Sequence, residues 1–552
     1  PEVLEKYSWY YMNVFITNKI EGKVFIVDGQ QRLSTLTLIA TKLFHLTKNP
    51  NLHDILRECI YARDMFQGNI FCIDNEKRKD VMQSILDGIE YDKPFKNKTE
   101  ETLVARYADI SKYIDAKSMD ENELTAFIYY FLNRLVLVEL SIQKDDTPMV
   151  FEVINDRGEA LKPFEILKGK MIGLLAKSDT EAYSKKWDDA IVRINAKEDN
   201  FFTDYLKSQF IFKKNATVES AIMSSYHRYI FDYNDIANRL SFRRTDKNHN
   251  ANIKHFINDN LEYYSKLYEK IGKSKDEYVS YNLYINGFSG LFQNIMAACE
   301  VNDPDETEKI KTIAKEADRL WVLFVLNGVY DSNEFQNVSY KLNELLPGKS
   351  LEEYRSIYND LIIKTIKEKR NVSGVVSLLD FNSFLRKNYS NTNTRFLRYL
   401  FARIEKYICD NTSQSMQNDV NYISTRTGNK TGYHIEHILS ENDTNRDYFA
   451  SNDEFEEKRN QLGGLILLKG LDNISSGNEE YNDKLKTYGN GLVWGHTLCP
   501  DFYHANKHFD AFNLSFKSKT GYEFKPYTVF DQVALNERSR LLYELIKVIW
   551  DV

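Results

Sequence analysis

The sequence predicts a predominantly helical α+β protein, and three observations indicate this class. Only nine prolines and 23 glycines interrupt its 552 residues, which suits long helices. From about residue 180 to residue 410, apolar side chains recur at helical spacing almost throughout, for example at residues 310–329 and 394–409. Strand-like runs lie near the two ends, at residues 23–27, 434–439 and 465–468. We therefore expect three domains, at residues 1–180, 181–410 and 411–552, with a linker at residues 410–430.

Composition and charge exclude several classes of protein. Apolar residues make up 42% of the chain and charged residues 28%, as in globular proteins. The net charge of −7 excludes a uniformly basic surface, so any face that binds nucleic acid must be a local patch. The five cysteines form no C-x-x-C pair, which argues against a disulfide framework or a zinc ribbon. No apolar run approaches the ~20 residues that span a membrane. The sequence thus predicts a cytoplasmic protein with no membrane partner.

The first chemical motif lies where a strand meets a helix. A strand is expected at residues 23–27, and an apolar stripe at helical spacing begins at Leu33. The N-terminus of a helix attracts phosphate, and an arginine fork binds two phosphate oxygens at once. The turn is therefore a candidate phosphate site, and the alternative is a structural turn whose arginine pairs only with its own aspartate. The residues of this turn are Asp28, Gly29, Gln30, Gln31 and Arg32.

Residues 27–36 resemble part of a known family. Their pattern of an apolar strand, DGQQR and L-S-T-L is similar to the ParB-like nucleotide-hydrolysing domain of GmrSD-type restriction enzymes. The resemblance implies an α/β module at the N-terminus in which Asp28, Gln30, Gln31 and Arg32 bind and hydrolyse a nucleoside triphosphate. The family's upstream pattern, Q-R-x-Y-S-W, is echoed only at residues 7–9, so we expect an N-terminus that is truncated or diverged.

A second block supports the same resemblance. It follows residues 135–142, which the sequence predicts to be a strand or a buried helix. Residues 151–158 read FEVINDRG and resemble the family's block F-x-x-x-N-x-R-G. The resemblance implies that Asn155 and Arg157 lie near the nucleotide. Pro163 then marks the start of another helix, where its missing N–H group costs nothing.

The second chemical motif is His-Ile-Glu-His at residues 434–437, in a predicted strand. Cleavage of a phosphodiester needs a base for water and a cation for the leaving oxygen. His437 suits the base because a histidine pKa lies near neutrality, and Glu436 suits a hard metal ion. Asn473 follows the strand at 465–468 and precedes the helix that contains Lys484. This is the order of a ββα-metal (HNH) finger, and the alternative is a strand that carries two ordinary histidines.

The wider run resembles the HNH domain of the same family. The family pattern is E-H-I, then L-G-N-L-x-L-L, then two asparagines and a lysine, and here the last three are Asn473, Asn478 and Lys484. The resemblance implies Mg²⁺ or Mn²⁺ held by Glu436 and Asn473, with His437 as the base and Lys484 in contact with phosphate. Two positions depart from the family, since Gly464 replaces an asparagine and Ser440 replaces a proline.

Together the resemblances imply a bacterial restriction enzyme that acts in defence against phage. The predicted activity is nucleotide-regulated, metal-dependent cutting or nicking of DNA, with modified foreign DNA as the expected target. The ParB-like module would supply the NTPase and the HNH module the endonuclease. The alternative is a non-cutting, nucleotide-dependent sensor or scaffold whose HNH fold is inactive. Either reading allows a homo-oligomer.

Overall fold

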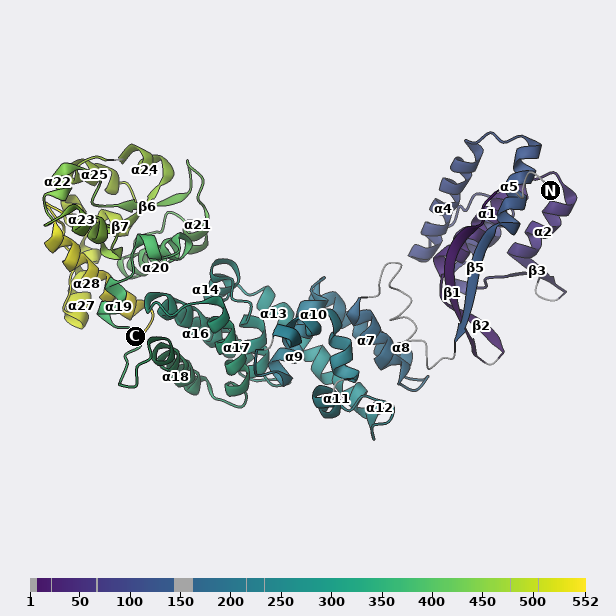
Figure 1. Cartoon of the computed structure of the whole chain (residues 1–552), viewed down its shortest axis with the longest axis horizontal. Helices are drawn as coiled ribbons and strands as arrows, with labels where there is room; N and C mark the ends of the chain where they lie inside the picture. The colour runs from purple at the N-terminus through teal and green to yellow at the C-terminus, as the bar shows by residue number, and fades with distance from the viewer. Residues whose placement is uncertain are drawn as a thin grey trace. The chain divides into compact units, whose positions relative to one another are not determined.

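The chain folds into two compact units, Pro1–Leu161 and Lys162–Val552, each with a hydrophobic core of its own (Figure 1). The computed structural model describes residues 7–20, 22–65, 68–142, 162–214, 216–232, 234–476, 478–504 and 506–552. Helices dominate and the strands form small sheets, which confirms the predominantly helical α+β class. The helical middle and the C-terminal part share one core in the second unit. The three-domain division stays a prediction.

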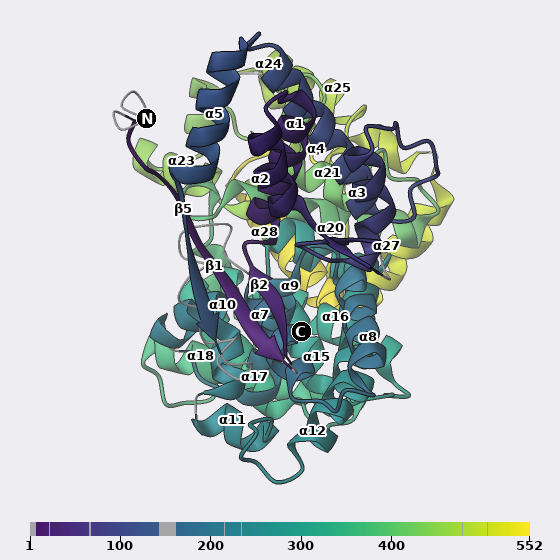
Figure 2. The same ribbon diagram turned by 90° about the vertical axis from the view of Figure 1, so that its right-hand side faces the viewer.

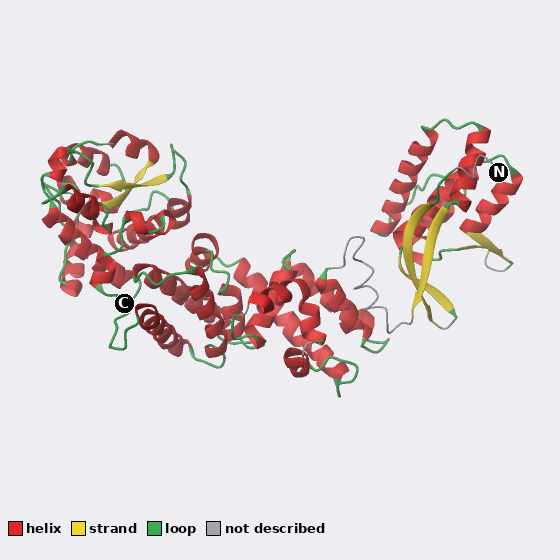
Figure 3. Ribbon diagram, in the orientation of Figure 1, coloured by secondary structure: helices red, strands yellow, loops and turns green. Residues whose placement is uncertain are grey.

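A three-stranded sheet forms part of the first unit (Figure 3). Its central strand, β1 (Tyr10–Ile20), is antiparallel to β2 (Lys23–Asp28) and parallel to β5 (Leu135–Ile142). The strand predicted at residues 23–27 is confirmed as β2. The segment at residues 135–142 is a strand and not a buried helix. A separate two-stranded ladder pairs β3 (Tyr61–Asp64) with β4 (Gly68–Phe71).

Helices supply most of the core of the first unit. α1 (Gln30–Leu46) packs beside α2 (Pro50–Ile60) (Figure 2), and both bury leucines such as Leu43 and Leu56. The helix predicted after the DGQQR turn is confirmed as α1, which begins inside the motif, at Gln30. The other helices described in this unit are η2 (Glu76–Arg78), α3 (Lys79–Leu86), α4 (Lys98–Asp115) and α5 (Glu121–Asn133).

The second unit begins with α7 (Pro163–Gly173), whose first residue is the proline expected at a helix start. The helices predicted at residues 310–329 and 394–409 are confirmed as α16 and α20. Two short segments, η5 and η6, are π-helical. The elements from here to α20 are α8 (Thr180–Ile194), α9 (Glu198–Phe210), α10 (Ala216–Phe231), α11 (Asn234–Leu240), α12 (His249–His255), η5 (Phe256–Leu261), α13 (Glu262–Gly272), α14 (Glu277–Tyr281), η6 (Asn282–Asn286), α15 (Leu291–Ala298), α16 (Glu306–Leu326), α17 (Ser332–Leu345), α18 (Leu351–Arg370), α19 (Phe381–Leu385), η7 (Tyr389–Asn391) and α20 (Thr394–Thr412).

A β-hairpin lies among the helices that follow. β6 (Tyr433–His437) and β7 (Leu465–Lys469) confirm the two strands predicted there, although β6 ends two residues early. The predicted linker contains a helix, α21 (Val420–Thr425), because Val420 and Ile423 are buried and the helix packs on α20. The other elements here are α22 (Asp443–Arg446), α23 (Asn452–Arg459), η8 (Leu462–Gly464), α24 (Gly470–Ser476), α25 (Tyr481–Tyr488), α26 (Val493–His496), η9 (Pro500–Tyr503), α27 (Lys507–Thr520) and α28 (Gln532–Ile549).

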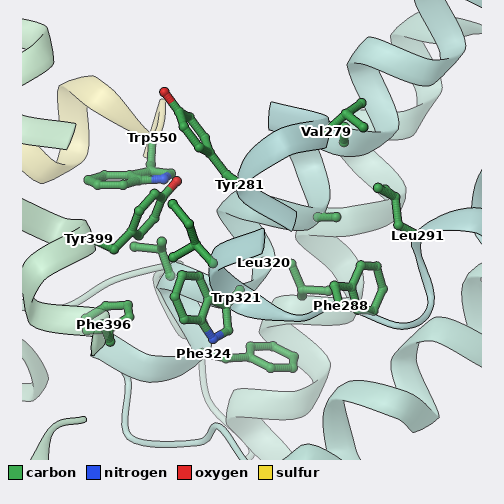
Figure 4. Close-up of a cluster of buried hydrophobic side chains, with 14 of the residues drawn as sticks. Val279, Tyr281, Phe288, Leu291, Leu320, Trp321, Phe324, Phe396, Tyr399 and Trp550 are labelled. Carbon is green, nitrogen blue, oxygen red and sulfur yellow. The ribbon is translucent and has the colours of Figure 1, made fainter. Parts of the chain in front are cut away.

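A buried polar network joins α16, α20 and the residue after α28. Asp318 is fully buried and accepts hydrogen bonds from Tyr399 (2.5 Å), Arg403 (3.1 Å) and Trp550 Nε1 (2.9 Å). Figure 4 shows the rings of Tyr399 and Trp550 close together beside Tyr281. A buried carboxylate that loses a donor is strongly destabilising, so this network fixes the end of α28 against α16.

The structure also locates the thiols and the apolar helices. Cys59 and Cys72 are exposed and the other three cysteines are buried, and all five are free thiols. Among the described residues, no helix combines the length and the apolar character needed to cross a lipid bilayer.

The buried carboxyl group of Glu405 on α20 leads to a prediction about pH. It accepts hydrogen bonds from the backbone N–H groups of Val493 (2.8 Å) and Trp494 (2.9 Å), and burial raises its pKa from 4.5 to about 7. A raised pKa means that the folded state holds the proton longer than the unfolded state does. The contribution of the protonated Glu405 carboxyl group to the stability of the folded state is therefore fully present below pH 4.5. It is lost as the pH rises through about 7.

We therefore expect the stability of the wild type, relative to Glu405→Gln, to fall by about 2–3 kcal/mol between pH 5 and pH 8. The glutamine does not titrate, and its single carbonyl oxygen can accept from only one of the two N–H groups, which lowers the stability of the variant equally at every pH. Urea unfolding of both proteins at each pH measures the difference. Parallel pH profiles for the two proteins would show that Glu405 is already ionised at pH 5.

Candidate functional site

The first candidate site lies at the end of the hairpin β6–β7. In the register of the hairpin, Glu436 pairs with Ile466 and His437 with Leu465, at the start of β7. Successive side chains in a strand point to opposite faces, so the two predicted functional groups leave the hairpin on different sides. Each side chain therefore has its own set of neighbours.

Glu436 faces α25. Its Oε1 accepts a hydrogen bond from Nζ of Lys484, and the same ammonium group donates to the backbone oxygen of His437 at 2.9 Å. Both side chains are buried, with Lys484 only 1% exposed. Burial lowers the pKa of Lys484, and the nearby carboxylate of Glu436 opposes that shift. Lys484 thus ties α25 to the end of β6, and the predicted phosphate contact of this residue stays a prediction.

His437 is held on the other side by Asn460. Its Nε2 lies 2.9 Å from Oδ1 of Asn460, and the amide of Asn460 is oriented because its Nδ2 donates to the backbone oxygen of Glu456 at 2.6 Å. An acceptor at Nε2 selects the tautomer with the proton on that nitrogen, which leaves Nδ1 as the basic atom. The ring also packs edge-to-face on Tyr389, with the ring centroids 4.9 Å apart.

The surroundings of His437 keep its imidazole neutral. Burial is the main cause that lowers its pKa from 6.5 to about 4, and the positive charges of Arg459 and Lys484 add to the shift. The hydrogen bond to Asn460 opposes it. A neutral imidazole can accept a proton from water at neutral pH, although a base with so low a pKa is weak. A negative charge brought next to the ring would restore its basicity.

Asn473 lies on α24, which packs against β6 and β7. Its Oδ1 is buried and, among the described residues, has no hydrogen-bond partner. Within the same residues, no group of three or more His, Cys, Asp or Glu side chains is placed to share a metal ion. A donor set of one carboxylate and one amide oxygen, from Glu436 and Asn473, has the chemistry that a hard divalent cation prefers. Their convergence on one ion stays a prediction.

The two departures from the family pattern have local explanations. A Cβ atom at Gly464 would lie 3.2 Å from both the backbone oxygen of Arg459 and Cδ1 of Leu535, so an asparagine has little room there. The Oγ of Ser440 donates to the backbone oxygen of Glu479 at 2.9 Å, which fastens the segment after β6 to the start of α25. Neither change removes a side chain that contacts His437.

The second candidate site is the turn between β2 and α1. Gly29 has φ +88°, and a Cβ atom there would lie 2.6 Å from Cβ of Phe15. Arg32 donates to Oδ2 of Asp28 (3.0 Å) and to the backbone oxygen of Val14 (2.5 Å), so its guanidinium joins α1 to β1. The pair of Arg32 and Asp28 agrees with the alternative interpretation of the motif, a structural turn in which the arginine pairs with its own aspartate. Both side chains of the pair remain 29% exposed, which leaves them accessible to a ligand.

The glutamines of this turn differ in their contacts. Gln30 donates from Nε2 to the backbone oxygen of Ile26 at 2.9 Å, which closes the turn. Gln31 is exposed, and its side chain makes no hydrogen bond to another described residue. Gln31 is therefore the polar side chain of the motif that makes no hydrogen bond stabilising the turn within the described residues. Asn155 and Arg157, the partners implied by the second block, lie outside the described residues.

Sequence reasoning missed three residues that surround these sites. Asn460 and Tyr389 contact His437, and Arg78 brings a second guanidinium to α1 by donating to Oγ of Ser34 at 2.7 Å. Asn460 lies four residues before Gly464, the position at which the family has an asparagine. The sequence could therefore have indicated Asn460 as a candidate site residue. Tyr389 and Arg78 lie far from the motifs in sequence, and no local pattern marks them.

Gly29→Ala is expected to destabilise the protein by more than Gly22→Ala does. Both glycines have positive φ, which costs a residue with a Cβ atom about 1–2 kcal/mol. The space around Gly22 is open, whereas a Cβ at Gly29 collides with Phe15. Urea unfolding of the two variants measures the difference, and equal losses of stability would mean that β1 moves away from the turn at no cost.

Comparison with known families gives two matches. Residues 3–172 match the model for the GmrSD restriction endonuclease, N-terminal domain. Residues 381–517 match the model for GmrSD restriction endonucleases, C-terminal domain. Together the matches cover more than half of the chain, and they include both candidate sites. No curated protein matches the chain.

Proposed function

This chain belongs to the GmrSD restriction endonucleases, and on that premise we propose that it is a nucleotide-regulated endonuclease or nickase that uses a divalent metal ion. The proposal assigns an HNH nuclease to residues 411–552, a ParB-like NTPase to residues 1–180 and a helical connection between them. The proposed target is DNA that carries a foreign modification, cut in the cytoplasm of a bacterium.

One observation carries the nuclease part of the proposal. At the end of β6, a neutral imidazole oriented by Asn460 and a buried carboxylate tied to Lys484 occupy adjacent positions. Nuclease chemistry needs a base for the attacking water and a metal ligand that act on the same phosphate. The family match over residues 381–517 contains this arrangement.

In the proposed mechanism, His437 accepts a proton at Nδ1 from the attacking water. The negative charge of the substrate phosphate raises the low pKa of His437 and so makes it a better base. Glu436 and Asn473 would hold Mg²⁺ or Mn²⁺, which supplies positive charge for the leaving oxygen when it is bound. Lys484 lies beside the backbone oxygen of His437, where its ammonium group would also be near a bound phosphate.

The nucleotide part rests on the turn at residues 28–32. Gln31 is exposed at the first turn of α1, where helix N–H groups point outward, and Arg32 supplies the cation. Asp28, beside Arg32, would polarise a water or hold the metal ion of the triphosphate. Asn155 and Arg157 complete the proposed site from the second block.

A second candidate function is a non-cutting sensor or scaffold that binds nucleotide and nucleic acid. The pairing of Glu436 with Lys484 favours it, because the ammonium group occupies the carboxylate that would hold a metal ion. The low pKa of His437 favours it as well, because a weak base slows hydrolysis.

A plasmid assay separates the two functions. Supercoiled DNA, unmodified and modified, is incubated with the protein in Mg²⁺ or Mn²⁺, with and without each nucleoside triphosphate. The nuclease proposal expects nicked or linear DNA that depends on the metal ion and responds to one triphosphate. Binding without any strand break, under all these conditions, would support the sensor.

A further inference from the structure

A cavity of about 320 Å³ opens in the second unit beside the start of α20. Trp321 and Phe396 form its apolar wall, and Figure 4 shows these two side chains on α16 and α20. Lys387 and Arg395 supply its positive charge. None of the described residues that line it carries a carboxylate, although the chain as a whole has a net charge of −7. The cavity is therefore a local cationic site on an acidic protein.

Lys387 is the unusual member of this lining. Its side chain is half-buried, and among the described residues it has neither an ion pair nor a hydrogen bond. Burial lowers the pKa of its ammonium group, and no carboxylate opposes that shift. A charge withdrawn from water without a partner is costly, and an anion that enters the cavity would offset the cost.

The other polar residues around the cavity are committed to the fold. Arg395 donates from Nη2 to the backbone oxygen of Tyr284, which orients its guanidinium at the rim. The neighbouring wall includes Asn286 from the π-helical segment η6. Such π-helical turns are rare and are found often at functional sites. Arg395 is thus held in place by a hydrogen bond, whereas the ammonium group of Lys387 has no such partner in the part of the chain that the structure describes.

The chain connects the cavity to the proposed nuclease site through a short segment. Lys387 precedes Tyr389 by two residues, and Tyr389 packs its ring against His437. Two residues span at most about 7 Å of chain, so the backbone of Lys387 lies within that distance of the backbone of Tyr389. The cationic residues of the lining also fall within residues 381–517, which match the C-terminal domain of the family.

We propose that this cavity binds a phosphate group of the DNA substrate other than the phosphate that is cut, with Lys387 and Arg395 as its contacts. The inference rests on the proposed function for its choice of nucleic acid. A DNA strand carries one negative charge per phosphate, and the two cationic side chains of the lining supply the opposite charge. Trp321 and Phe396 are only 7% and 2% exposed, so they close the cavity as packing residues and leave phosphate as the group to be contacted. A free phosphate would make the same cationic contacts, so the experiment has to distinguish the two sources.

The test is the salt dependence of DNA binding by the full chain. Fluorescence anisotropy of a labelled duplex in EDTA measures affinity without cleavage, at several salt concentrations. Each phosphate that a protein neutralises contributes about 0.9 to the slope of log affinity against log salt. We expect Lys387→Gln and Arg395→Gln each to lower the slope by about this amount. Lys341→Gln, which removes an exposed lysine that pairs with Glu344, should leave it unchanged.

A second arm identifies the source of the phosphate. Thermal unfolding in inorganic phosphate, compared with chloride of equal ionic strength, reports whether the free anion stabilises the wild type and not Lys387→Gln. An unchanged DNA slope with a lost phosphate effect would assign the cavity to a free phosphate instead of a strand. No change in either measurement would overturn the inference. If the wild type bound no duplex in EDTA and also cut none in the plasmid assay, the proposed nuclease function would be rejected, and the phosphate arm would then decide the cavity alone.

Discussion

Plasmid cleavage is expected to fall by about 10²–10⁴-fold when His437 is replaced by alanine, which is the range that a general base contributes. The substitution removes the imidazole that Asn460 orients and leaves Glu436 and Lys484 in place. Initial rates of plasmid cleavage in Mg²⁺ or Mn²⁺ measure the effect. Titration with Mn²⁺ should give the same affinity for the variant and the wild type, because His437 is not a proposed ligand.

His434→Ala is the matched control for this prediction. It lies on the same strand and is also half-buried, and its Nε2 has no hydrogen-bond partner among the described residues. Its removal is expected to leave the cleavage rate within a few-fold of the wild type. If His434→Ala lost as much activity as His437→Ala while both stayed folded by circular dichroism, the base assignment would be wrong.

Arg32→Ala is expected to weaken triphosphate binding by about 10-fold to 100-fold, since charged hydrogen bonds to phosphate contribute about 1.5–3 kcal/mol. Arg32→Lys should be a poor replacement because it loses the forked geometry. Isothermal titration of each triphosphate into the folded variants measures the effect. If nucleotide gates the nuclease, the variant should also alter cleavage without any change in the second unit.

The contacts of Arg32 complicate that test, because the same guanidinium holds Asp28 and the backbone of β1. Its loss is therefore expected to destabilise the first unit as well, by about 1–3 kcal/mol. Gln31→Ala separates the two effects, since Gln31 makes no hydrogen bond to another described residue. Wild-type nucleotide affinity in Gln31→Ala, together with lost stability in Arg32→Ala, would mean that the turn is structural.

Local patterns in the sequence were enough to predict the elements that carry the motifs. An apolar run before Gly29 and a helical stripe after it predicted β2 and α1. Short strand-like segments predicted β6 and β7. β1 was not predicted, although its aromatic and β-branched residues are typical of a strand. Its pairing is what local sequence does not reveal. It pairs in parallel with β5, whose Leu135 lies opposite Tyr10, and a pairing between segments so distant in sequence depends on the whole fold.

The neighbours of the candidate sites were harder to predict for the same reason. The resemblance brought Lys484 to this site as a phosphate contact but did not predict its hydrogen bond to Glu436. No pattern indicated that Asn460, at the end of α23, contacts His437. The predicted linker illustrates a related limit. Its polar composition hid the two apolar residues, Val420 and Ile423, that bury α21 against α20. Packing between elements, and not local propensity, decides these details.

The contact between Trp550 and Asp318 has a consequence for the order in which a ribosome completes this protein. The two residues are 232 positions apart, and synthesis at about 5–20 residues per second needs about 10–45 s to supply the partner. α28 also packs against η8, the segment that leads into β7. The hairpin with His437 therefore lacks part of its support until α28 has been translated. By then the first unit, with its DGQQR turn, has long been synthesised. Translation thus delivers the proposed regulator before the proposed nuclease can finish folding.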